Sequence, residues 1–177
     1  MRRHAGSICG DKRIMLLLLL AAFPFAMQAQ VISLEEGKPA IINGISYGYL
    51  ISNEQVKSAG GEEYSRFEVT LYATNQSGCI RLYADGAERP LSAPAANIFA
   101  TFQCVNANGK RLTAKQGTVK LRDLYLSVRT GAGVRQSVKA GYIFSDGETI
   151  KATIIVLVPD NERPQFNCTL SNPVEIR

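Results

Sequence analysis

The chain has 177 residues, with 20 Lys and Arg, 15 Asp and Glu, no tryptophan and a single histidine at position 4. Outside the N-terminal segment, therefore, no histidine is available for a Ser-His or Cys-His catalytic pair or as the commonest zinc ligand. We expect no catalytic residue, no metal site and no cofactor.

The N-terminal segment has the layout of a secretory signal peptide. Four basic residues precede position 14, an apolar run covers residues 14–27, and small Ala29 follows. The run is shorter than the roughly 20 apolar residues that a membrane-spanning helix needs. We expect cleavage after Ala29, which leaves a single domain over residues 30–177. Met15 as the alternative start would not change that domain.

Residues 30–177 read as short runs in which apolar and polar residues alternate. The clearest run covers residues 67–73, where Phe67, Val69 and Leu71 face one way and the polar residues face the other. This period of two is typical of half-buried strands. We expect eight to ten strands in an antiparallel β-sandwich, immunoglobulin-like in general architecture. A sandwich is favoured over a small barrel because the strands and loops vary in length.

Turn residues separate these runs. Residues 75–78 turn the chain, prolines mark a loop over 85–94, and Asn108 with Gly109 predicts a tight hairpin because both tolerate positive φ. A further turn is expected at residues 131–133.

Three features near the C-terminal half predict finer detail. The alternation slips by one residue at Arg122 and Asp123, which is typical of a β-bulge. Asp146 and Gly147 predict a second hairpin turn. Residues 149–158 are apolar on both faces, which predicts a central strand that is covered on both sides.

Three segments carry a resemblance to a protein group. They cover residues 64–79, 102–111 and 141–149, with sequences YSRFEVTLYATNQSGC, FQCVNANGKR and GYIFSDGET. These segments resemble uncharacterised small exported β-sandwich proteins of Bacteroidetes-type bacteria. The resemblance implies a β-sandwich and implies no activity.

Three cysteines follow the signal segment: Cys79, Cys104 and Cys168. Export makes disulfides feasible, and an odd count leaves one thiol over. Cys79 and Cys104 would pair if their segments formed a hairpin, whereas Cys104 and Cys168 both lie on apolar faces and would bridge two sheets. Both candidate disulfides stay open, as do a bond between Cys79 and Cys168 and buried free thiols.

A basic segment lies in the middle of the chain. Its side chains form a candidate anion-binding surface made of Lys120, Arg122, Arg129, Arg135 and Lys139. Arginine suits phosphate and carboxylate because its planar fork bonds two oxygens, so the expected ligand is an acidic polysaccharide or a lipopolysaccharide phosphate. The plainer interpretation is a solvated face that discourages strand-edge pairing.

These observations favour a non-catalytic, exported binding or interaction module of the cell envelope, located in the periplasm, on the cell surface or outside the cell. The expected partner is a protein or an anionic glycan. Nucleic acid is not expected, and neither is a membrane span after signal cleavage. One alternative is a carboxylate-based glycan-active enzyme, because acids gather at residues 62–63, 146–148 and 160–162. The other is a structural subunit of a surface assembly.

Overall fold

The computed structural model describes residues 30–59, 62–85, 97–131, 133–159, 162–171 and 173–176. Within these ranges the chain forms twelve strands and no helix. This confirms the all-β class but exceeds the expected eight to ten strands. The same ranges accordingly contain no helix with the length and hydropathy needed to cross a bilayer. The expected signal peptide, residues 1–29, lies outside the described residues.

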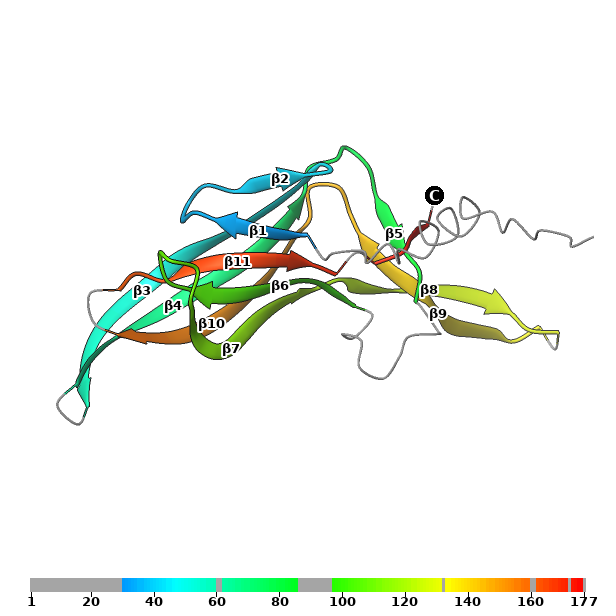
Figure 1. Ribbon diagram of the computed structural model, residues 1–177. Helices are drawn as coiled ribbons and strands as arrows, with labels where there is room; N and C mark the ends of the chain where they lie inside the picture. The colour runs from blue at the N-terminus through cyan, green and yellow to red at the C-terminus, as the bar shows by residue number, and fades with distance from the viewer. Residues whose placement is uncertain are drawn as a thin grey trace, which may run out of the picture.

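The strands form three antiparallel sheets of four strands each (Figure 1). The first sheet, in spatial order, contains β1 (Val31–Leu34), β11 (Gln165–Leu170), β6 (Ile98–Val105) and β7 (Arg111–Lys120). The second contains β10 (Thr149–Pro159), β4 (Glu62–Asn75), β3 (Ile45–Ala59) and β2 (Ala40–Ile42). The third contains β12 (Glu175–Ile176), β5 (Arg81–Tyr83), β9 (Arg135–Phe144) and β8 (Arg122–Arg129). The sequence did not predict that a third sheet would form.

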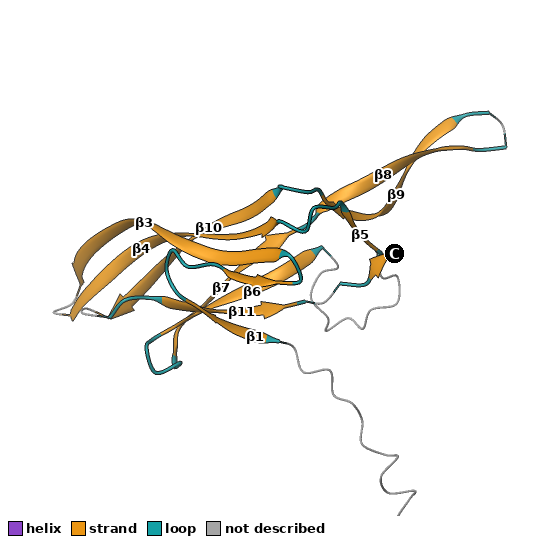
Figure 2. Ribbon diagram, turned by 90° about the horizontal axis from the view of Figure 1, so that it is seen from above, coloured by secondary structure: helices purple, strands orange, loops and turns teal. Residues whose placement is uncertain are grey.

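The first and second sheets pack against each other and form the body of the molecule. Seen from above, β3, β4 and β10 lie on one side and β1, β6 and β11 on the other (Figure 2). On β4, Phe67, Val69 and Leu71 point into the core, as the alternation predicts. A Cβ built on Gly117 of β7 would overlap Leu71 Cδ1, so glycine at this position lets β7 pass β4 without a shift of the Leu71 side chain.

The strand over residues 149–158 is not central, contrary to the prediction. Among the described strands, β10 lies at the edge of the second sheet and pairs only with β4. Its inner residues are buried, but Ile155 and Leu157 on the outer face are 40% and 55% exposed. The apolar run on both faces therefore marked an exposed outer surface and not a second covering layer.

The phase slip at Arg122 and Asp123 is not a β-bulge. Leu121 lies between β7 and β8, at the point where the chain leaves the first sheet for the third. Its side chain is buried, and its amide donates to Asn97 O at 2.8 Å. A change of sheet shifts the alternation just as an extra residue would. The register shift of this strand pair lies two residues further along, between Leu124 and Tyr125.

The two predicted hairpin turns have different outcomes. Asn108 and Gly109 connect β6 to β7, which pair directly, and Gly109 has a φ of 75°. That hairpin is confirmed. Asp146 and Gly147 also make a tight turn, with a Gly147 φ of 70°, but the turn connects β9 of the third sheet to β10 of the second. It is therefore a corner between sheets and not a hairpin.

Candidate functional site

Strands β8 and β9 of the third sheet extend beyond the strands that pair with them at their base. Strand β5 pairs with β9 only between Tyr142 and Phe144, whereas β8 pairs with β9 as far as Arg129 opposite Arg135. From Gly141 outward, β8 and β9 thus form a two-stranded ribbon, which we call the arm (residues 124–141). It projects away from the rest of the molecule in both views (Figures 1 and 2).

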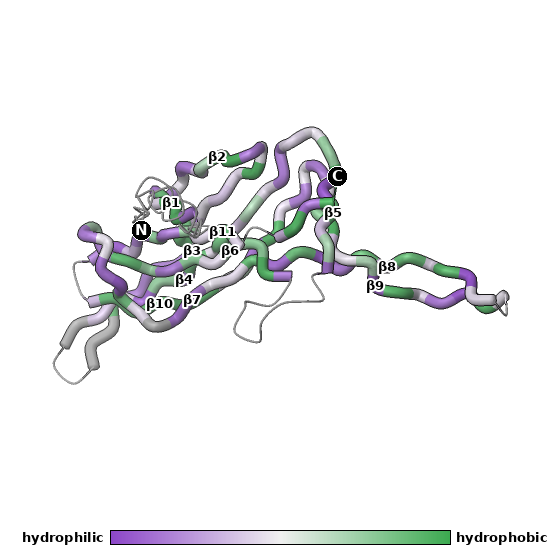
Figure 3. The backbone as a smooth tube through the Cα atoms, turned by 45° about the vertical axis from the view of Figure 1, so that its right-hand side comes forward, coloured by the Kyte–Doolittle hydropathy of each residue, from purple (hydrophilic) through white to green (hydrophobic). Residues whose placement is uncertain are grey.

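One face of the arm is apolar and exposed. Leu126 lies directly opposite Val138, and Val128 lies opposite Gln136. Because side chains alternate along a strand, these residues share a face with Val134, which follows the tip turn in the same phase. Their exposed fractions are 51% for Leu126, 47% for Val128, 61% for Val134 and 45% for Val138. We call these four residues the apolar face; hydrophobic positions run along both strands of the arm (Figure 3).

The opposite face of the arm is basic. Tyr125 lies opposite Lys139, and Arg129 lies opposite Arg135 near the tip. Like charges directly opposite each other destabilise a strand pair. Both arginine side chains are exposed, and among the described residues neither guanidinium has an ion-pair or hydrogen-bond partner. An anion bound at the tip would therefore offset the repulsion between Arg129 and Arg135.

The base of the arm holds the other basic residues in ion pairs. Lys139 Nζ lies 3.1 Å from Asp123 Oδ1 and 3.4 Å from Asp85 Oδ2. Its hydrogen bond to the Tyr142 hydroxyl, followed by the contact with Asp123, raises the pKa of Lys139 above its usual value.

Arg122 is occupied in the same way. Its Nη2 lies 3.6 Å from Glu148 Oε2 and 3.2 Å from Ser145 Oγ. Lys120 belongs to the end of β7 in the first sheet. The structure thus divides the predicted anion-binding surface: it places Arg129 and Arg135 together at the tip, uses Lys139 and Arg122 to brace the base, and leaves Lys120 on the body.

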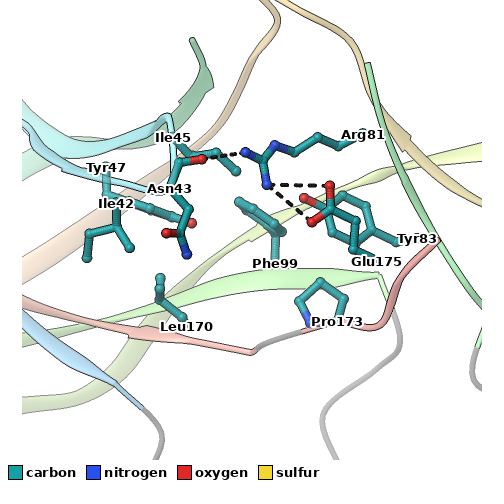
Figure 4. Close-up of a pocket in the computed structure, with 10 residues that line it drawn as sticks. All are labelled: Ile42, Asn43, Ile45, Tyr47, Arg81, Tyr83, Phe99, Leu170, Pro173 and Glu175. Carbon is teal, nitrogen blue, oxygen red and sulfur yellow. Dashed lines mark hydrogen bonds and ion pairs between the residues drawn. The ribbon is translucent and has the colours of Figure 1, made fainter. Parts of the chain in front are cut away.

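A small pocket lies where the three sheets meet (Figure 4). It is lined by Ile42, Asn43, Ile45, Tyr47, Arg81, Tyr83, Phe99, Leu170, Pro173 and Glu175. Its volume of 110 Å³ is well below the roughly 300–1,000 Å³ of typical ligand pockets. Arg81 Nη1 lies 3.3 Å from Glu175 Oε2, and the same guanidinium donates to Asn43 O. The two charged groups of the pocket, Arg81 and Glu175, are therefore already paired with each other.

The two tyrosines of the pocket are core residues. Burial raises the pKa of Tyr83 to about 12 and raises that of Tyr47 further. Tyr47 stacks on Phe99 with ring centroids 5.9 Å apart. Burial and ring contacts thus indicate that both side chains act in packing. By contrast, Tyr125 on the arm is 58% exposed.

Neither candidate disulfide is present, because Cys79, Cys104 and Cys168 are free thiols. Cys104 and Cys168 lie on the paired strands β6 and β11 of one sheet, so they do not bridge two sheets. Cys104 is opposite Phe166, and Cys168 is opposite Phe102, so the two thiols share the buried face two residues out of register. Burial raises the pKa of Cys104 to about 11 and that of Cys168 to about 12. Both behave as small apolar core residues.

The acid-rich turn at residues 146–148 has a structural role. Asp146 Oδ1 accepts a hydrogen bond from Gly78 N at 3.0 Å, and Glu148 Oε2 accepts one from Ser145 N at 2.7 Å. The other two acid-rich spots lie wholly or partly outside the described side chains. In the part of the chain that the structure describes, no three His, Cys, Asp or Glu residues come close enough to hold a metal ion.

Asn75 is a structural centre that the sequence analysis missed. Its buried side chain donates to Cys79 O at 2.9 Å and to Phe144 O at 3.0 Å, and it accepts from Ser77 Oγ at 2.6 Å. These bonds tie the end of β4 to the end of β9 and so fasten the third sheet to the body. The signal in the sequence was an Asn at the end of an apolar run, which we interpreted only as a turn.

Comparisons with known proteins add no relative: no family model, no curated protein and no solved structure matches this chain. The resemblance to small exported proteins of Bacteroidetes-type bacteria stays a prediction. Functional inference therefore rests on the geometry of the arm.

Proposed function

We propose that this protein is a non-catalytic binding module of the cell envelope and that the arm is the part that contacts its partner. The observation that carries the proposal is the apolar face, four aliphatic side chains on a ribbon that no other described strand covers. Exposed contiguous apolar surface marks interaction sites in proteins. Exposed apolar residues also occur on the body, such as Ile155 and Leu157 of β10, but those of the arm lie on a ribbon whose opposite face is basic.

The tip arginines favour an anionic partner. Arg129 and Arg135 face each other without an acid among the described residues, and a phosphate, sulfate or carboxylate between them would offset their repulsion. The acidic glycans and lipid phosphates of a cell envelope supply such groups.

Retention on a heparin-like resin at low salt tests this proposal. We expect the protein to be retained and to elute as salt rises, because screening weakens exposed charge pairs. The Arg129→Gln/Arg135→Gln variant should flow through. The matched control is Lys110→Gln/Lys151→Gln, which removes the same charge from exposed sites on the body and should elute near the wild type. Wild-type protein that flows through at low salt would show that the tip does not bind anions.

Export forms part of the proposal. The basic, apolar and small residues of positions 2–29 support a mature protein that begins near Gln30, and an immunoglobulin-like arrangement of the two body sheets stays a prediction. Intact-mass measurement of material recovered outside the cytoplasm tests the first point. A mass that includes residues 1–29 would contradict it.

A structural subunit of a surface assembly is the second candidate. Strand β8 ends the third sheet, with β9 as its only partner in the described chain, and an open strand edge is a template for pairing with another chain. Sedimentation velocity over a range of protein concentrations tests this candidate. Assembly that depends on concentration would support it.

A further inference from the structure

The two faces of the arm have opposite chemistry, and a bilayer interface satisfies both at once. We propose that the arm docks in the headgroup region of an anionic lipid bilayer, with the apolar face toward the acyl chains and the tip arginines among the phosphates. This inference rests on the proposed function, because it names the partner of the same arm.

The geometry of the ribbon separates a bilayer from a folded protein partner. The arm is one sheet thick, so Leu126 and Val138 leave one side while Arg129 and Arg135 leave the other. A protein surface that covers one side leaves the other side in water. An amphipathic element that lies in a membrane interface buries its apolar face at the boundary of the acyl chains, while its charged face stays among headgroups and water.

The charge of the arm matches an anionic surface. Residues 124–141 contain three basic residues and no acidic residue. Lys139 is already paired with Asp123 at the base of the arm, so the tip carries the unpaired positive charge. Arginine bonds a phosphate through two N–H groups at once, and long arginine side chains reach back to the headgroups from an apolar surface. The tip arginines thereby gain their missing anion in the same position that buries the apolar face.

The small size of the apolar face sets the kind of binding. Four aliphatic side chains are a modest hydrophobic contribution, and lasting attachment to membranes takes two signals, one apolar and one electrostatic. Binding should therefore be reversible, should require anionic lipid and should weaken with salt. Neutral vesicles offer only the apolar half of the contact.

A tryptophan reporter tests the orientation directly. The chain contains seven tyrosines but no tryptophan, so Val128→Trp places a sole tryptophan, which is excited selectively at wavelengths longer than those that tyrosine absorbs, on the apolar face, and Ser127→Trp places one on the opposite face as the matched control. The probes are vesicles of phosphatidylcholine alone and of equimolar phosphatidylcholine and phosphatidylglycerol. With the anionic vesicles we expect the Val128→Trp emission to shift to the blue and to be quenched by brominated acyl chains. The Ser127→Trp emission should stay close to its value in buffer.

Co-sedimentation of the protein without the tryptophan substitution measures how strongly it partitions into the vesicles. Removing both tip charges in Arg129→Gln/Arg135→Gln should lower partitioning into the anionic vesicles by about thirtyfold, since each basic residue near such a surface contributes about a kcal/mol. The Lys110→Gln/Lys151→Gln control should partition as the wild type does.

The contrary outcomes are distinct. No blue shift and no co-sedimentation with anionic vesicles at low salt would overturn the bilayer inference, and retention on the heparin-like resin would then leave the proposed function standing. A blue shift of Val128→Trp that grows with protein concentration in the absence of lipid would assign the apolar face to a second copy and would also overturn it. Failure with both vesicles and resin would reject the arm as a binding element.

Discussion

The body and the arm are built from the same kind of strand, yet they use it differently. In both, apolar and polar residues alternate. In the body, Val69 and Phe102 point into a space that the facing sheet fills, whereas Leu126 and Val138 of the arm point into solvent. Alternation thus indicates that a strand has one apolar and one polar face, but it does not indicate what packs on the apolar face. On the arm, no described residue packs on that face, so we expect a binding partner to cover it.

The arm depends on the body for its order. A two-stranded hairpin alone is marginally stable in water, and this one is anchored at its base by the ion pairs of Lys139 and by close backbone packing at Gly141. A Cβ on Gly141 would lie 2.3 Å from Tyr83 O, and the φ of Gly141 is 144°. Glycine at this position therefore permits the contact between β9 and β5 from which the arm extends.

The largest effect on stability is expected from truncating a buried apolar side chain, compared with an exposed one on the arm. Phe144 of β9 lies where the third sheet packs on the body; it is fully buried and makes an edge contact with Phe99 of β6 at a centroid distance of 5.3 Å. Phe144→Ala should lower the free energy of unfolding by about 3–5 kcal/mol because it leaves a cavity. Leu126→Ala on the arm should change it by no more than about 0.5 kcal/mol. Urea unfolding measures both, and similar losses would contradict the division into body and arm.

A smaller effect is expected at the junction of the two regions. Asn75→Ala removes the donors to the buried Phe144 carbonyl and the partly buried Cys79 carbonyl, and an unsatisfied buried group costs about 1–3 kcal/mol. We expect a loss of about 2–3 kcal/mol in the free energy of unfolding. The control is Asn106→Ala, which removes comparable hydrogen bonds from the exposed turn between β6 and β7 and should cost about 1 kcal/mol. An equal cost at both positions would show that Asn75 is only a turn residue.

The body should also respond to alkaline pH through its thiols. Burial raises the pKa of Cys104 to about 11 and that of Cys168 to about 12, above the roughly 8.5 of an unfolded chain. The folded state then favours the protonated thiols, so their contribution is complete below the unfolded pKa and is lost as pH rises through the folded values. Under reducing conditions, urea unfolding should show stability falling between about pH 8 and 11. A Cys104→Ala/Cys168→Ala variant should show a shallower fall; an unchanged slope would assign the effect to other groups.

Local order was predictable from the sequence, but the partners of each strand were not. The alternation in β4 and the turn at Asn108 and Gly109 follow from neighbouring residues, and both occur as expected. The edge position of β10 depends on which other strands pair with it, and the sequence of residues 149–158 does not indicate those pairings. A change of sheet at Leu121 gives the same phase slip as a bulge, so the pattern alone could not distinguish them.

The candidate site shows the same limit. Arg129 and Arg135 flank a short turn, so their closeness was readable from their spacing. Lys139 and Arg122 looked equivalent to them in the sequence, but Asp85 and Glu148, which are distant in the chain, take up their charge. The alternation of Leu126 and Val128 predicts an apolar face. It does not predict that the face is exposed, because this depends on β5, which pairs with β9 only as far as Tyr142.

Deleting most of the arm should have the smallest effect on stability, although it removes the most residues. Tyr125 lies opposite Lys139, so an Asn-Gly pair in place of residues 126–138 would close the shortened strands with a two-residue turn. The ion pairs of Lys139 with Asp123 and of Arg122 with Glu148 remain in such a variant. We expect the free energy of unfolding to change by less than about 1 kcal/mol, since the removed residues bury little surface, and we expect retention on the heparin-like resin and on anionic vesicles to disappear. If the shortened protein instead unfolds, the arm belongs to the body's core after all. If it folds and still binds, the contact surface lies elsewhere on the molecule.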